Sequence, residues 1–298
     1  MFQTGESGLG YAAGQLLNSF VDVASRPADI SARQVVLART EEVASRFRAA
    51  SEQLNVLQNG VTQDLRNAID RVNDLARQVA TINARITEAT GAGHSPNDLL
   101  DQRDQLVSEI SEYVQVSSIF AEDGSQNLFI GGGQMLVLGA QTATLVGLRD
   151  DYNPAMLRVG VQDQAGTRTL PPDILVAGSI AGLLRFQDQD LRDARNLVGQ
   201  MATALAYAVN EQQALGYNLG NPPSAGSPLF NVGAPRVAAS TTNSGNAAFT
   251  IGVANAMELR ASDYELRFDG TQYTLTRLSD NQPVNGSPFS AADMATGV

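Results

Sequence analysis

Residues 43–89, VASRFRAASEQLNVLQNGVTQDLRNAIDRVNDLARQVATINARITEA, decide the fold. Apolar side chains recur in this stretch at steps of three and four residues, which is the spacing of one face of an α-helix. The stripe consists of Val43, Phe47, Ala50, Leu54, Leu57, Val61, Leu65, Ala68, Val72, Leu75, Val79, Ile82, Ile86 and Ala89. The spacing predicts a helix that starts near Asp29, a good N-cap residue, and runs to Thr90.

One irregularity lies inside this stripe. The steps from Leu57 to Val61 and from Val61 to Leu65 are both four residues, and Asn59-Gly60 lies between them. Either one helix of about 60 residues and about 90 Å runs through this point, or two antiparallel helices meet there. We favour the continuous helix, because glycine costs only about 1 kcal/mol inside a helix and the stripe resumes at once.

Three further helices are predicted around this one. The first ends before Pro27 and carries a stripe of Leu9, Ala13, Leu16, Phe20 and Val23. The second follows Gly91-Ala92-Gly93-His94, with Ser95 as N-cap, Pro96 in the first turn and Asp98 in the capping-box position. Its stripe is Leu99, Leu100, Arg103, Leu106, Val107, Ile110 and Val114. The third starts near Ser179, and its heptad frame is Leu184, Gln187, Leu191, Ala194, Val198, Met201, Leu205, Ala208, Gln212 and Leu215.

Short β segments occupy the remaining regions. Residues 127–130 and 135–138 flank Gly131-Gly132-Gly133 and predict a hairpin, with further strands at 145–148 and 157–161. Near the end of the chain, alternating apolar residues on both sides of Asp269-Gly270 predict a second hairpin.

These patterns predict an α+β protein: an elongated helical rod or bundle with long helices and inserted, mainly-β modules. We expect a discontinuous helical rod domain over residues 1–116 and 179–218, with a β-rich insertion at 117–178. Residues 219–235, rich in glycine and proline, are expected to be a linker, and 236–298 a second β-rich domain that looks truncated.

Composition excludes many chemistries. The 298 residues contain no Cys, no Trp and one His, and all 20 basic residues are Arg. Disulfides, thiolate and lysine nucleophiles, and zinc sites built from several Cys and His are therefore excluded.

The net charge of −11, without a basic stripe, argues against nucleic acid and anionic membranes as partners. No apolar run approaches the roughly 18 residues of a membrane span, and residues 1–6 do not resemble a signal peptide.

The remaining candidates for chemistry have simpler structural explanations. Gly131-Gly132-Gly133 precedes a strand, whereas a phosphate loop opens a helix, and His94 lies in a glycine-flanked loop. Asp188 and Asp190 begin like a calcium loop that then fails at its fifth, sixth and twelfth positions. The carboxylates Asp98, Asp101 and Asp104 are better explained by helix capping and solvated ion pairs. We predict no catalytic, cofactor-binding or metal-ligating residues, and no enzyme.

Two separated segments nevertheless carry a resemblance. Residues 97–107, NDLLDQRDQLV, resemble the hallmark segment of the bacterial flagellar hook-associated proteins of the hook–filament junction, which are flagellin-like. A second block is similar to the same family: Gly178-Ser179, Gly182-Leu183-Leu184, Gln189-Asp190-Leu191, residues 196–200, Asn210-Glu211-Gln212 and Gly216-Tyr217. The first helix, the break at Pro27 and the hairpin at Asp269-Gly270 also look like this family.

The resemblance implies a structural part of the extracellular flagellum, exported through the flagellar type III channel without a cleaved signal and joining hook to filament. It implies the hook protein, a second junction protein and further copies of the chain as partners, with an export chaperone that binds through a missing C-terminal segment. The terminal helical segments of the family look absent here, so we expect a soluble fragment that does not co-assemble with hook or filament subunits.

Two other readings stay open. Another member of the flagellin-like family, such as the second junction protein, is one alternative, and residues 97–107 argue against it. A carbohydrate-binding or hydrolytic module that uses the β regions is the other, because a pair of acids is all that a glycosidase requires.

Overall fold

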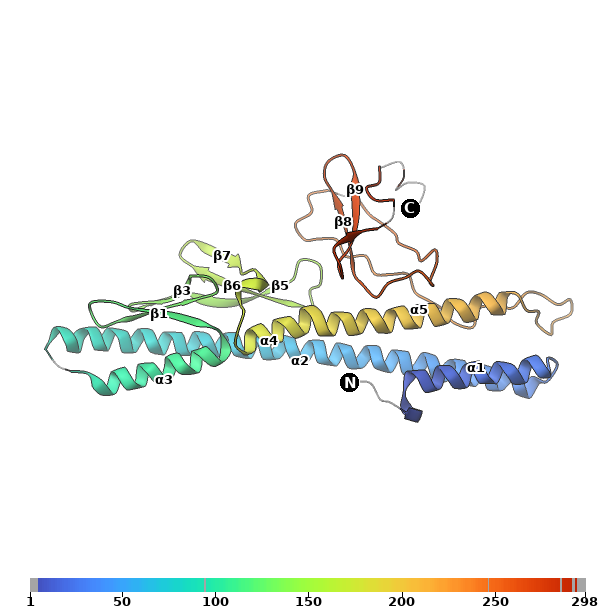
Figure 1. The fold of residues 1–298 in the computed structure, drawn as a ribbon, viewed down its shortest axis with the longest axis horizontal. Coiled ribbons are helices and arrows are strands. Elements are labelled where there is room, and N and C mark those ends of the chain that lie inside the picture. The colour runs from blue at the N-terminus through green and yellow to red at the C-terminus, as the bar shows by residue number, and fades with distance from the viewer. Residues whose placement is uncertain (1–4, 94, 246, 285, 291–292, 294–298) are drawn as a thin grey trace. The chain divides into compact units, whose positions relative to one another are not determined.

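The computed structural model describes residues 5–93, 95–245, 247–284, 286–290 and 293 (Figure 1). The helices are α1 (Leu9–Ser25), α2 (Ile30–Gly91), α3 (Asn97–Tyr113), α4 (Ser179–Arg185) and α5 (Arg192–Ala214). A π-helical segment, η3 (Phe186–Leu191), joins α4 to α5, and short 3-10 helices are η1 (Gly5–Ser7) and η2 (Pro172–Ile174). The strands are β1 (Val116–Phe120), β2 (Gln126–Ile130), β3 (Gln134–Leu138), β4 (Gln141–Thr142), β5 (Thr144–Arg149), β6 (Leu157–Asp163), β7 (Gly166–Thr169), β8 (Tyr264–Phe268), β9 (Tyr273–Arg277) and β10 (Gln282–Pro283). Long helices and separate antiparallel sheets confirm the predicted α+β class.

The chain forms two compact units. The first contains Met1–Leu54, Arg192–Val237 and Ala247–Val298, and the second contains Asn55–Leu191 and Ala238–Asn246. The boundary between Leu54 and Asn55 falls inside α2, so this one helix contributes to both units.

The predicted continuous helix is confirmed. α2 spans 62 residues without a break at Asn59-Gly60. Its start is capped as expected, because Asp29 Oδ1 accepts hydrogen bonds from the amides of Ser31, at 2.9 Å, and Ala32, at 3.3 Å. The apolar stripe faces inward along most of the helix, and Leu54, Leu65, Val72, Leu75, Val79 and Ile86 are at most 1% exposed.

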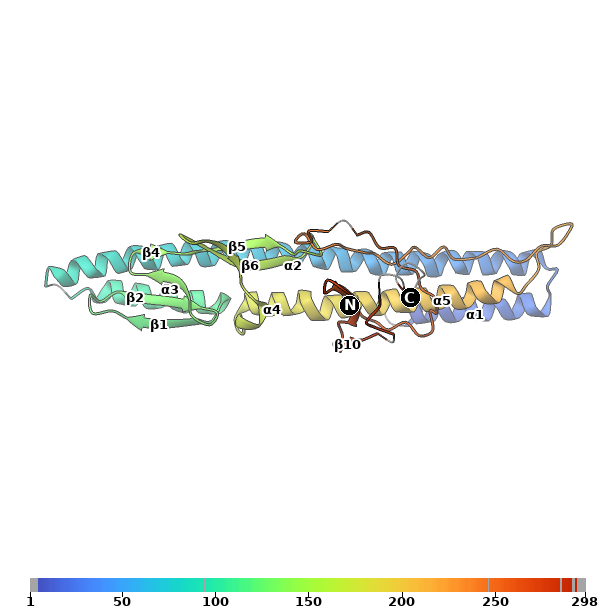
Figure 2. The same cartoon turned by 90° about the horizontal axis from the view of Figure 1, so that it is seen from above.

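The second unit packs two sheets on a pair of helices. α3 runs back along the C-terminal part of α2, and the sheets β1-β2-β3-β4 and β5-β6-β7 lie over this pair (Figures 1 and 2). One hydrophobic core joins α2, α3, α4 and both sheets. The predicted hairpin is β2–β3, and the strands predicted at 145–148 and 157–161 are β5 and β6. All of these pairs are antiparallel, so the β regions need no crossover helices.

The first unit has a smaller core. Ala12 and Leu16 of α1 pack against Val36 and Val43 of α2, and Leu205 of α5 lies at the edge of this cluster. The predicted second hairpin is confirmed as β8–β9, and β10 adds a short third strand. Residues 219–235, expected to be a linker, contain no helix or strand.

One predicted helix cap is wrong. Ser95 Oγ donates to the side chain of Asn97, at 2.9 Å, and makes no cap to the helix. Pro96 occupies the N-cap position, and its carbonyl accepts from the amides of Leu99 and Leu100. The hydroxyl is used as a donor to the neighbouring amide side chain, so the start of α3 is set by main-chain hydrogen bonds.

The helix predicted from Ser179 forms, but its heptad frame is partly wrong. Val198, Ala206 and Val209 are buried, whereas Met201 is 43% exposed and Leu215 lies beyond the helix and is 76% exposed. The positions Leu184, Gln187, Leu191 and Val198 of the frame are buried, so the frame fails only beyond Val198. A stripe with heptad spacing drifts by about 20° per heptad around a straight α-helix, which explains why the later positions turn outward.

Candidate functional site

Residues 97–107 lie on α3, and Arg103 is the buried residue among them. Its side chain is on the inner face, where the residue is only 3% exposed. Nη1 donates to the carbonyl of Gly124 at 2.8 Å, and the guanidinium lies 5.5 Å from the centre of the Phe120 ring. Burial lowers the pKa of Arg103, although the carboxylate of Asp104 opposes this change. Arg103 therefore ties α3 to strand β1 and to the turn that follows it.

The three aspartates of the same segment do not converge. Asp98, Asp101 and Asp104 are all exposed, and the Asp104 carboxylate lies 3.9 Å from Arg103 Nε. All three face solvent, and none forms a side-chain cap on the helix.

The second family-like block begins where the chain passes close to the end of α3. Gly178 has a φ of +89°, and a Cβ built on it would lie 2.4 Å from the carbonyl oxygen of Tyr113. No side chain fits there, so glycine allows the start of α4 to pack directly on the last turn of α3. The end of α3 and the start of α4, which are far apart in the sequence, are thus in contact in the second unit.

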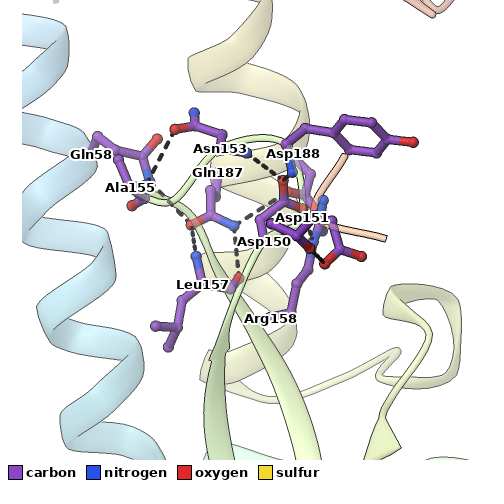
Figure 3. A network of polar contacts seen from close by, with 11 residues as sticks. Gln58, Asp150, Asp151, Asn153, Ala155, Leu157, Arg158, Gln187 and Asp188 are labelled. Carbon is purple, nitrogen blue, oxygen red and sulfur yellow. Dashed lines mark hydrogen bonds and ion pairs between the residues drawn. The ribbon is translucent and has the colours of Figure 1, made fainter. Parts of the chain in front are cut away.

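A network of amide side chains lies just after this contact (Figure 3). Gln187, on the π segment, is 1% exposed. Its Oε1 accepts from the amide of Leu157 on β6, and its Nε2 donates to the carbonyl of the same residue, both at 3.1 Å. Gln58 of α2 donates its Nε2 to Gln187 Oε1, also at 3.1 Å. The network joins α2, β6 and the π segment.

Beside these amides, Arg158 bridges two carboxylates. Its Nε lies 2.7 Å from Asp150 and its Nη1 lies 2.5 Å from Asp188, the next residue of the π segment. Burial raises the pKa of Asp150, but the hydrogen bonds from Arg158 and from two backbone amides outweigh this effect and leave it lowered. Burial likewise lowers the pKa of Arg158, and its two acidic partners turn the net change upward. Each charge therefore stabilises the other.

Other buried amides act in the same way on main-chain groups. Asn73 of α2 donates to the carbonyl of Leu145 and accepts from its amide, both at 2.8 Å. Asn83 makes the same pair of contacts with Gln126, at 2.8 and 3.1 Å. These side chains fix the register of the sheets on α2. The apolar spacing does not reveal these two residues; the signal in the sequence is a polar residue directly after a stripe position, Val72 or Ile82.

The remaining candidates are placed as follows. Gly131, Gly132 and Gly133 have φ values of +45°, +71° and +104° and form the turn between β2 and β3. Asp188 is engaged with Arg158 in a helical segment, so it does not start a calcium loop. His94 lies outside the described residues. Among the described residues, no group of three or more acidic or histidine side chains is arranged as a metal site, and no helix has the length and hydropathy of a membrane span.

Comparison with known families decides what kind of protein carries these features. The family model described as "Flagellar hook-associated protein FlgK helical domain" matches residues 1–230. This chain belongs to the FlgK family. A second model, "Flagellar hook-associated protein 1, D2-like domain", matches residues 238–297. The FlgK helical-domain match includes both family-like segments, so the resemblance on which the sequence analysis relied is confirmed.

Individual FlgK relatives agree with this assignment. The chain is 33% identical to flagellar hook-associated protein 1 of Escherichia coli over 298 residues, which is 99% of this chain and 54% of that protein. It is 34% identical to the Salmonella typhimurium protein of the same name over 283 residues, or 94% of this chain and 50% of that protein. The chain thus spans about half the length of these FlgK relatives.

A solved FlgK structure has the same fold. The flagellar hook junction protein FlgK from Burkholderia pseudomallei superposes with a TM-score of 0.88 and 32% sequence identity, covering 96% of this chain and 52% of that one. Within this FlgK chain, buried amides and Arg103 hold strands, turns and helices together. These polar side chains form structural contacts within the fold.

Proposed function

We propose that the chain is a structural segment of a flagellar hook-associated protein that joins the hook to the filament. The observation that carries the proposal is the agreement with the flagellar hook junction protein from Burkholderia pseudomallei over 96% of this chain. The helices and sheets supply shape and packing surfaces, and the role is one of assembly and not of catalysis. The relatives named above are flagellar hook-associated proteins, which supports a structural role in motility.

The proposed partners follow from this position. They are the hook protein on the cell side, a second junction protein toward the filament, and further copies of the same chain. We place the protein outside the cell, exported through the flagellar type III channel with the help of an export chaperone. A chain without cysteine forms no disulfide that would obstruct passage through a narrow channel.

We further propose the domain division expected from the sequence. Residues 1–116 and 179–218 form the helical domain, 117–178 the β-rich insertion and 236–298 the second β-rich domain. Residues 219–235 link them, and the lack of a helix or strand in this mostly exposed segment supports the assignment, with Leu229 and Phe230 packed against the core of the first unit. Brief proteolysis of the purified chain, followed by mass spectrometry, should find the first cuts in 219–235; first cuts inside α2 or α5 would contradict the division.

The junction role is tested by deleting the gene in the source bacterium. We expect hooks without attached filaments and flagellin monomers released into the medium, observed by electron microscopy and by immunoblotting of the culture supernatant. Complementation with the full-length gene should restore filaments and motility. Normal filaments on the deletion strain would refute the proposal.

A further inference from the structure

Helix α5 carries two apolar stripes that are one residue apart. The inner stripe, Val198, Ala202, Leu205 and Val209, is buried or half-buried in the first unit. The outer stripe, Leu197, Met201, Ala204 and Ala208, consists of the residues that directly precede these four. Leu197 is 50% exposed and Met201 is 43% exposed, whereas Val198 is 7% exposed. Moving the helix by one residue would exchange one stripe for the other, because neighbouring residues differ by about 100° around an α-helix.

The spare residue that such a shift needs lies directly before α5. In the π segment Phe186–Leu191, the backbone hydrogen bonds join residues that are five apart in the sequence, whereas an α-helix joins residues four apart. The segment therefore holds one residue more than an α-helix of the same length. If this extra residue moves along the helix, each residue that it passes rotates by about 100° and takes the place of the residue that follows it. A bulge that leaves 186–191 and travels toward the end of α5 therefore brings the outer stripe to the place of the inner one.

We propose that the π segment is a register switch, which lets α5 dock through either of its two apolar stripes. The observed state is held at both ends of the moving part. At the π segment, Asp188 pairs with Arg158 at 2.5 Å. At the far end of α5, Asn210 Oδ1 accepts from the amides of Leu229 and Phe230, both at 2.9 Å, and its Nδ2 donates to the carbonyl of Phe230 at 2.7 Å.

The two stripes are similar enough to compete. The inner stripe has three larger apolar side chains and one alanine, and the outer stripe has two larger ones and two alanines. Because Leu and Met are larger than Val, the total size of the side chains is similar, and neither stripe contains a charge. Their burial therefore favours the two states to a comparable extent. The polar contacts of Asp188 and Asn210 then select the state in which Val198 faces inward. Gln187 precedes Asp188 and holds Leu157 in either register, so the second unit need not change.

The test uses the absence of cysteine in the chain. Single variants Leu197→Cys and Val198→Cys report which stripe is exposed, through the rate at which each thiol reacts with a maleimide or disulfide reagent. In the otherwise unchanged chain, position 197 should react quickly and position 198 slowly. In a background with Asp188→Ala and Asn210→Ala, we expect the order to reverse, with the rate at 198 rising and that at 197 falling by about tenfold each.

A deletion provides the matched control. Removing Gln189, an exposed residue of the π segment, removes the spare residue but keeps the flanking helices in register. In the same Asp188→Ala and Asn210→Ala background, this deletion should restore fast reaction at 197 and slow reaction at 198. Unchanged rates in the double variant, faster reaction at both positions, or a reversal that persists after the deletion would each overturn the proposal. The readout is thiol reactivity of the isolated chain, so it is independent of the junction role.

Discussion

The side chain of Gln187 forms with Leu157 the two hydrogen bonds that a neighbouring strand would form with it. Its Nε2 donates to the Leu157 carbonyl and its Oε1 accepts from the Leu157 amide, both at 3.1 Å (Figure 3). A side chain of the π segment thereby pairs with the main chain of β6 at Leu157, on the side that faces away from β5. Because Gln187 is 1% exposed, water does not compete for these groups.

Replacement of this residue should be costly. Gln187→Leu fills a similar volume but leaves the amide and carbonyl of Leu157 without their side-chain partner. Because each unpaired buried polar group costs about 1–3 kcal/mol, we expect a loss of about 2–4 kcal/mol of unfolding free energy, measured by urea denaturation. The control is Gln189→Leu, an exposed position of the same π segment, which should change stability by no more than about 0.5 kcal/mol. Equal effects of the two variants would contradict this account of Gln187.

Two glycines of the second family-like block should respond to alanine with opposite signs. Gly178→Ala would place a Cβ 2.4 Å from the Tyr113 carbonyl oxygen, at a φ of +89°. We expect it to destabilise the chain by more than about 2 kcal/mol. Gly182→Ala, four residues later on the exposed side of α4, meets no atom within 4 Å and should stabilise by about 0.5–1 kcal/mol. Thermal unfolding of the two variants in parallel gives the answer, and a stabilising Gly178→Ala would refute the close packing of α4 on α3.

Arg103 should act through its contacts and not through its charge alone. Arg103→Met keeps much of the side-chain volume but loses the hydrogen bond to the Gly124 carbonyl and the stacking on Phe120. We expect a loss of about 1–3 kcal/mol in denaturant unfolding. Gln105→Met, at an exposed position of the same helix, is the matched substitution and should be nearly neutral. If both variants unfold at the same urea concentration, Arg103 does not anchor the turn.

The ion pairs of Arg158 predict how stability depends on pH. The folded-state pKa of Asp150 lies below its ordinary value of 3.8, so the folded chain binds fewer protons than the unfolded chain near that pH. The contribution of Asp150 is therefore present above about pH 4 and is lost as the pH falls through the lowered pKa. Asp150→Asn should flatten the fall of the urea midpoint between neutral pH and pH 3. The control Asp173→Asn, at an exposed position, should leave the pH dependence of the urea midpoint unchanged. If the midpoint of Asp150→Asn falls as steeply as that of the unchanged chain, the ion pair of Asp150 with Arg158 does not cause the pH dependence.

Continuity of α2 is also testable. Gly60 has no atom within 4 Å of a built Cβ and lies inside the helix. Gly60→Ala should therefore stabilise the chain by about 0.5–1 kcal/mol, whereas Gly60→Pro should destabilise it by about 3 kcal/mol or more. Circular dichroism at 222 nm during thermal unfolding measures both effects. A loop at Asn59-Gly60 would instead tolerate the proline.

The long-range regularity of the sequence made the helices predictable. The stripe of α2 repeats over more than a dozen apolar residues, so its helical face and its passage through Gly60 follow from spacing, and its start follows from the N-cap residue Asp29. The hairpins were equally accessible, because Gly131-Gly132-Gly133 and Asp269-Gly270 mark turns between alternating strands. Both kinds of element depend on interactions between residues close in sequence.

The polar contacts were not predictable in the same way. Asn73, Asn83 and Gln187 bind main-chain groups that are far away along the chain, and an amide beside a stripe looks the same whether it faces solvent or a strand. The π segment was missed for a related reason: its extra residue leaves no mark in the composition, and the heptad frame from Leu184 to Leu215 hides it. Arg103 was placed on the correct face, but its acceptor, the Gly124 carbonyl, emerges only from the fold.

The uninterrupted course of α2 has a mechanical consequence. A force or torque applied to one half of this helix reaches the other half through a continuous ladder of backbone hydrogen bonds, with no loop to absorb it. An α-helix of about 90 Å bends only gently under such a load. The 62 residues of α2 therefore form one stiff element, in which a local distortion affects the neighbouring turns on both sides.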